Sequence, residues 1–140
     1  MVTIKTMKNY NPDRPIDPLE WNNLDEDEHL NLVERYHRKK RIKIPNLRVH
    51  TIIHVVVESQ VALDEEIPVK KTLERLMLEG LCRHDSIHAI GFVLAGYMFN
   101  LLKHGANDQD INANYYRQLE ELTAEGWLKS ANEEMEDERE

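Results

Sequence analysis

The spacing of apolar side chains along the chain predicts helices. Asp25 can cap a helix over residues 26–39, where Leu30, Val33 and His37 recur at helical spacing. Further helices are expected after Pro45, from Pro68 to Gly80, over residues 83–103, and from Ile111 to a closing Trp127. We therefore expect an all-α, single-domain bundle of about five helices.

The segment over residues 49–57 is the most ambiguous, because its β-branched side chains also favour a strand. Strict alternation of apolar and polar positions fails there, since Ile52 adjoins Ile53 and residues 55–57 are all valine. We therefore expect a helix. Because that helix is apolar on nearly every side, it should lie at the centre of the fold.

The two ends of the chain differ from its middle. Pro12, Pro15 and Pro18 disfavour helix, so residues 1–19 are expected to form an extended N-terminal segment. The helical domain is expected over residues 20–130. Acidic side chains dominate residues 131–140, which are expected to form a solvated tail.

Composition narrows the class of protein. A chain of 140 residues with 41% hydrophobic and 31% charged side chains is typical of one soluble globular domain. Its net charge of -8 argues against nucleic acid as a partner. The single cysteine excludes an internal disulfide and fits a cytoplasmic location. We expect no membrane partner, because there is no signal peptide and the apolar runs are short or interrupted.

Two histidine pairs carry the candidate chemistry. His50 and His54 are four residues apart, as are His84 and His88, so each pair lies on one helical face. Both helical faces otherwise carry side chains typical of a protein core. Gly91 and Ala95, on the face that carries His84 and His88, are small enough to let a neighbouring helix approach closely. Buried imidazole nitrogens need either a hydrogen-bond network or a cation, and a divalent ion satisfies several at once.

We therefore predict one metal site with His50, His54, His84 and His88 as ligands. Glu58 is a candidate further ligand or general base, although it lies about 12 Å from His50 along the helix axis. Asp85 and His37 are expected to contact and orient the ligating imidazoles without binding the ion. Zinc, iron, manganese and nickel all suit such a mixed histidine and carboxylate set, and two adjacent ions remain an alternative.

Three functions are compatible with these residues. The leading hypothesis is a small metal-binding protein, in its enzymatic form a metal-dependent hydrolase. The alternative is a non-enzymatic helical adaptor, whose histidines form a structural network and whose surface engages a protein partner or a second copy. A third, weaker hypothesis is nucleic acid binding through the basic residues between Arg35 and Lys43, which a solvated helix end explains better.

Three separated segments also carry a family resemblance. They are residues 21–37, ending Val33-Glu34-Arg35-Tyr36-His37; residues 54–60, His-Val-Val-Val-Glu-Ser-Gln; and residues 73–91, with Arg83-His84-Asp85-Ser86-Ile87-His88. Together they resemble an uncharacterised bacterial family, domain of unknown function 1841, from about Trp21 to Lys103. Ser59 and Cys82 depart from the expected pattern, away from the proposed ligands. The resemblance implies no activity, because that family has no established function.

Overall fold

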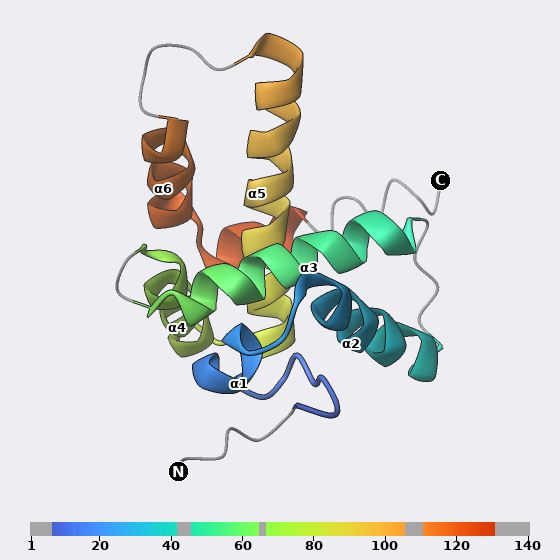
Figure 1. Ribbon diagram of the computed structural model, residues 1–140. Coiled ribbons are helices and arrows are strands. Elements are labelled where there is room, and N and C mark those ends of the chain that lie inside the picture. Colours follow the sequence, from blue (N-terminus) through green and yellow to red (C-terminus); the bar gives the residue numbers. More distant parts are fainter. Residues whose placement is uncertain (1–6, 42–45, 65–66, 106–110, 131–140) are drawn as a thin grey trace, which may run out of the picture.

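The computed structural model describes residues 7–41, 46–64, 67–105 and 111–130, and the regular structure there is entirely helical. Figure 1 shows the arrangement. The helices are α1 (Pro18–Asn22), α2 (Glu26–Lys39), α3 (Leu47–Ala62), α4 (Val69–Leu78), α5 (Arg83–His104), α6 (Ile111–Glu121) and a final segment over residues 124–130. The all-α prediction is confirmed, whereas the expected number of about five helices is too low: there are about seven.

Two short helices account for the difference. Asp17 caps α1 by accepting a hydrogen bond from the Leu19 N–H (2.9 Å), and Pro18 occupies the first helical turn. The segment over residues 1–19, predicted to be extended, is therefore helical from Pro18 on, and the Arg14 N–H donates to the Asn11 carbonyl (3.0 Å) in a turn before it. Near the other end, helix α6 ends at Glu121, and the Thr123 hydroxyl accepts from the Gly126 N–H (3.0 Å). Trp127 thus belongs to a separate helix and does not close α6.

The capping signals located the other helix ends well. Helix α2 spans the predicted 26–39, and Asp25 and Glu28 cap it reciprocally through their side chains. Gly80 follows the end of α4 with a φ of +113°, a backbone conformation that residues with a Cβ rarely adopt. Pro45, expected in the first turn of α3, and the expected acidic tail over 131–140 lie outside the described residues.

Helix α3 is the centre of the fold. It packs against α1, α2, α4 and α5, and Figure 1 shows it crossing in front of α5. One side of α3 contributes Val57 and Val61 to a core shared with α4, α5 and α6. The opposite side contributes Val55 to a second core with Trp21 and Val33. The helix prediction for residues 49–57 and its central position are both confirmed.

The crossing of α3 and α5 depends on a glycine. A Cβ placed on Gly91 would lie 2.7 Å from Ile53 Cγ2, which is closer than side-chain atoms pack. The close approach expected at Gly91 is therefore confirmed. Ala95, one turn further on, is exposed, so the same expectation for Ala95 is wrong.

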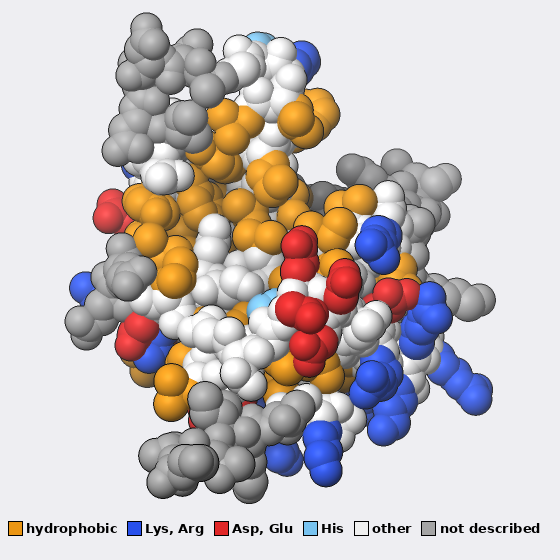
Figure 2. All heavy atoms as spheres, in the orientation of Figure 1, with side chains coloured by type: hydrophobic (Ala, Val, Ile, Leu, Met, Phe, Trp, Pro, Cys, Tyr) orange, Lys and Arg blue, Asp and Glu red, His pale blue; other side chains and the backbone are white. Residues whose placement is uncertain are grey.

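Beyond the crossing, α5 continues past the rest of the molecule beside α6 (Figure 1). Hydrophobic side chains gather over this part in Figure 2, and Phe92, Phe99 and Leu102 are among the exposed ones. Among the described helices, α5 alone is long and apolar enough to cross a membrane, and 33% of the apolar stretch that meets this criterion is buried inside the protein. Core helices of soluble proteins also meet this criterion, so the expectation of no membrane partner stays a prediction.

Substituting two glycines of α5 tests the close crossing. Gly91→Ala introduces the clash with Ile53, whereas a Cβ on Gly96 meets nothing within 4 Å. Both variants gain about 0.5–1 kcal/mol of helix propensity, and only Gly91→Ala is overpacked, at a cost of about 1–3 kcal/mol. Urea unfolding should show Gly96→Ala more stable than wild type and Gly91→Ala less stable than Gly96→Ala by that cost. Equal stabilisation of both variants would contradict the close crossing.

Candidate metal centre

Three helices bring five histidines into one cluster. His37 comes from α2, His50 and His54 from α3, and His84 and His88 from α5. The ring centroids of His54 lie 5.0 Å from those of His37 and of His88, and those of His84 and His88 are 4.3 Å apart. The two predicted pairs therefore meet across the α3–α5 crossing, as expected, and α2 adds a fifth ring.

The cluster contains two groups of three histidines that can hold a metal ion. One is His37, His50 and His54, and the other is His54, His84 and His88. Within each group, one ligand nitrogen from every ring lies within 4.8 Å of the others. His54 belongs to both groups, which makes its orientation decisive for the whole cluster.

A buried ion pair lies close to His54. Glu58, one turn further along α3, is 0% exposed, and both of its oxygens accept hydrogen bonds from Arg83 at the start of α5. The two distances are 2.6 Å and 2.9 Å, the paired geometry in which guanidinium binds carboxylate most strongly. Arg83 Nη1 also donates to the Pro12 carbonyl (3.0 Å), so the pair ties α3, α5 and the N-terminal segment together.

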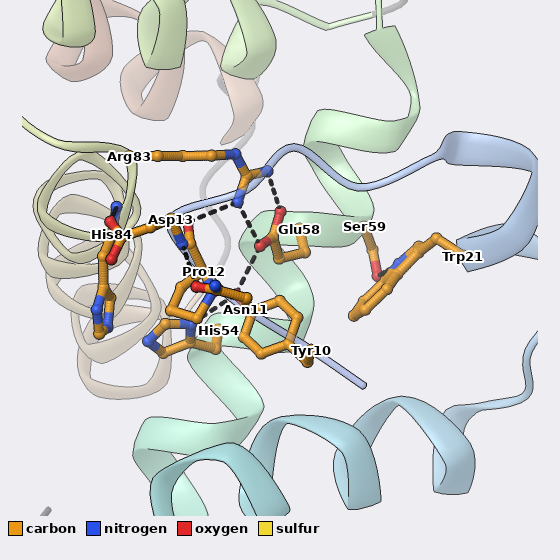
Figure 3. Close-up of polar contacts among 10 residues, drawn as sticks. All are labelled: Tyr10, Asn11, Pro12, Asp13, Trp21, His54, Glu58, Ser59, Arg83 and His84. Atoms are coloured by element: carbon orange, nitrogen blue, oxygen red, sulfur yellow. Dashed lines mark hydrogen bonds and ion pairs between the residues drawn. The ribbon is translucent and has the colours of Figure 1, made fainter. Parts of the chain in front are cut away.

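Tyr10 connects this ion pair to His54 (Figure 3). Its hydroxyl donates to Glu58 Oε2 at 2.6 Å and lies 3.1 Å from His54 Nδ1. The hydroxyl has one proton, and the ionised carboxylate can only accept, so the proton points to Glu58. His54 Nδ1 must therefore carry the proton that it shares with the Tyr10 oxygen. In a neutral ring, this leaves the lone pair on His54 Nε2.

His54 Nε2 faces the other histidines. It lies 3.0 Å from His88 Nε2, which donates a hydrogen bond to it when no ion is present. His37 has the same tautomer as His54, because its Nδ1–H donates to the Val33 carbonyl at 2.8 Å. The Nε2 atoms of His37, His50 and His84 are buried and have no hydrogen-bond partner among the described residues. The lone pair on His37 Nε2 is therefore unused, and His50 and His84 each have a buried ring nitrogen without a partner among the described residues.

Burial keeps four of these rings neutral. Together with the smaller effect of the neighbouring histidines, it lowers the pKa of His50 to about 4 and that of His88 to about 3. The pKa of His54 falls well below its ordinary value for the same two reasons. Burial also lowers the pKa of His84, against the opposing charge of Asp13. Neutral imidazole is the form that binds metal ions, so the cluster needs no deprotonation near pH 7.

The structure places two of the predicted residues differently from expectation. Glu58 is in neither group of candidate ligands, because Arg83 and Tyr10 occupy its oxygens; it lies behind His54 instead. His37, expected to support the ligands, is itself a member of one group. Asp85 acts on His84 through its charge, which partly opposes the lowering of the His84 pKa by burial.

Sequence reasoning missed Tyr10 and Arg83. Tyr10 lies in a segment without helical periodicity, 44 residues from His54, so spacing offers no signal for it. Arg83 could have been recognised from the sequence, because it directly precedes His84 in the first turn of a predicted helix whose neighbouring side chains face the core. A buried arginine requires a carboxylate partner, and Glu58 was the one carboxylate already placed on a core-facing stripe.

The ion pair makes a testable contribution to stability. Arg83→Met leaves Glu58 as a buried, unpaired charge and should lower the free energy of unfolding by about 3–5 kcal/mol. The double variant Glu58→Gln/Arg83→Met removes that charge and keeps an acceptor for Tyr10, so urea unfolding should show it more stable than Arg83→Met alone. A double variant no more stable than Arg83→Met would contradict the pairing.

Comparison with known proteins adds no relative. No family model matches the chain, no curated protein is similar to it, and no solved structure matches its fold. The resemblance to domain of unknown function 1841 therefore stays a prediction, and the function has to be argued from the histidine cluster itself.

Proposed function

We propose that this protein binds one divalent transition-metal ion in the histidine cluster and uses it to activate water in a hydrolytic reaction. The observation that supports metal binding most strongly is the set of buried Nε2 atoms without a partner, on His37, His50 and His84. An unsatisfied buried polar atom destabilises a folded protein by about 1–3 kcal/mol. An ion held by His37, His50 and His54 would engage two of these three rings, and an ion held by His54, His84 and His88 would engage the third.

The shared histidine argues for one ion at a time. His54 Nδ1 is engaged by Tyr10, so the ring has a single lone pair, on Nε2, to offer. The two groups of three histidines would then be alternative sets of ligands that share His54, and one set at a time would hold the ion. This favours a mononuclear centre over the two adjacent ions left open by the sequence.

The donor set narrows the choice of ion. Both groups consist entirely of imidazoles, which suit zinc, iron, nickel and copper, whereas manganese prefers carboxylate oxygens. With Glu58 held by Arg83, manganese loses the ligand that made it a candidate. We therefore favour zinc, iron or nickel.

Neutral ligands also favour hydrolytic chemistry. An ion held by three imidazoles keeps its full charge and an open position, and this type of site lowers the pKa of bound water to about 7. Glu58 is not proposed as the general base, because Arg83 and Tyr10 hold it away from the cluster. With His54, His84 and His88 as ligands, His50 would remain outside the ligand set, and its pKa of about 4 makes it a poor proton acceptor near pH 7.

The adaptor is the second candidate. The hydrogen bond between His54 and His88 supports a structural network, and α2 carries separate acidic and basic surfaces (Figure 2). The adaptor explains less, because all three buried Nε2 atoms would stay without partners, whereas an ion held by His37, His50 and His54 would engage two of those rings. Nucleic acid remains the weakest candidate, since Arg38 on the basic surface is already paired with Glu34.

Metal content and metal-linked stability separate these candidates. Protein purified without an affinity tag should contain close to one equivalent of metal, and added metal at 100 times its Kd should raise the free energy of unfolding by about 2.7 kcal/mol. His54→Ala should abolish this gain. His104→Ala, an exposed histidine at the end of α5, should leave it unchanged. Less than about a tenth of an equivalent, with no binding on titration, would rule out the metal function.

Tyr10→Phe tests the support behind His54. It removes the oxygen that accepts the His54 Nδ1 proton and should weaken metal affinity by about 10- to 100-fold, with the stoichiometry unchanged. Tyr36→Phe is the control, because that ring also adjoins the cluster, 5.8 Å from His84, and takes no part in the hydrogen bonds to Glu58. Equal affinities of the two variants, measured by competition with a chelator, would contradict the proposed role of Tyr10.

A further inference from the structure

A pocket of about 360 Å³ opens between α3 and α5 and reaches the histidine cluster. Nine residues line it: Asn46, Val49, His50, Ile53, His54, Ile87, His88, Gly91 and Phe92. Val49 and Phe92 are 51% and 63% exposed, whereas His54 and Ile87 are each 1% exposed. The pocket therefore runs inward from the protein surface and ends at the histidines.

Among the described residues, no charged side chain lines the pocket. Apart from the histidines, the polar side chain is that of Asn46, and the remaining walls are aliphatic, aromatic or glycine. Phosphate, carboxylate or sugar groups would leave most of their oxygen atoms without a donor against such walls. Its volume lies at the small end of the range for small-molecule sites.

The inner end of the pocket adjoins any ion that the cluster holds. His50 belongs to one group of candidate ligands, His88 belongs to the other, and His54 belongs to both. An ion bound by either group thus has at least two ligands in contact with the pocket. A molecule in the pocket would meet the ion with one end and the apolar walls with the rest.

We propose that the pocket binds a small, neutral molecule that has an apolar body and a single neutral nitrogen or oxygen donor directed at the ion. This inference rests on the proposed metal site and adds the class of ligand. It predicts that affinity depends on the apolar length of the ligand, because each methylene group buried against Val49, Ile53 and Phe92 leaves water.

The test uses the full-length protein loaded with cobalt(II), whose visible absorption reports a change of ligands. The probes are 1-methyl-, 1-ethyl-, 1-propyl- and 1-butylimidazole, which coordinate through the same nitrogen. Each added methylene should tighten binding about fourfold, so the Kd of 1-butylimidazole should be about 60-fold below that of 1-methylimidazole.

Two matched variants of α3 locate the effect. Val49→Asn places an amide in the pocket wall and should reduce the ratio of methyl to butyl Kd several-fold. Ile52→Asn alters a similarly exposed, β-branched residue of the same helix that does not line the pocket, and should leave the ratio unchanged. The ratio is insensitive to a change in cobalt affinity that affects both probes alike.

The outcomes separate this inference from the proposed function. A cobalt spectrum that all four imidazoles change with equal Kd would overturn the apolar ligand class and leave the metal site intact. The same holds if Ile52→Asn reduces the ratio as much as Val49→Asn. Failure to bind cobalt at all would overturn both proposals.

Discussion

The buried carboxylate of Glu58 is the constraint on which the candidate site depends. A charge that is 0% exposed is tolerated only with a partner, and Arg83 supplies it through two hydrogen bonds. The same carboxylate accepts the hydrogen bond of the Tyr10 hydroxyl, which leaves the tyrosine oxygen as an acceptor for His54. One ion pair thus joins three segments of the chain and selects the tautomer of the histidine at the centre of the cluster.

These hydrogen bonds explain how so many polar side chains can be buried inside a small helical protein. The close crossing at Gly91 brings α3 and α5 together, and the histidine pairs face each other next to it. Burial then keeps His54 neutral, and the tautomers of His37 and His54 leave their Nε2 atoms available. The apolar pocket reaches His50, His54 and His88 from the surface, and no charged side chain of the described residues lines it.

Local rules predicted the long helices and the histidine pairs, and long-range contacts account for the errors. Periodicity and capping located α2 and α5, and spacing by four residues placed His50 with His54 and His84 with His88. The role of Glu58 was misassigned because its partners lie 25 and 48 residues away in sequence. His37 entered the ligand set for the same reason: periodicity shows that it faces inward, but not which rings it meets. Short helices such as α1 depend on one cap and are missed by periodicity.

The central claim is that Glu58 and Tyr10 hold His54 with its proton on Nδ1 and offer Nε2 to a metal ion. Nitrogen-15 NMR of the histidine side chains tests it most directly, in the full-length protein before and after one equivalent of zinc. We expect His54 to be neutral and protonated on Nδ1 without metal, and zinc to shift its Nε2 resonance while the Nδ1 proton remains. A proton on Nε2 in the metal-free protein, or His54 resonances that zinc leaves unchanged, would contradict the account.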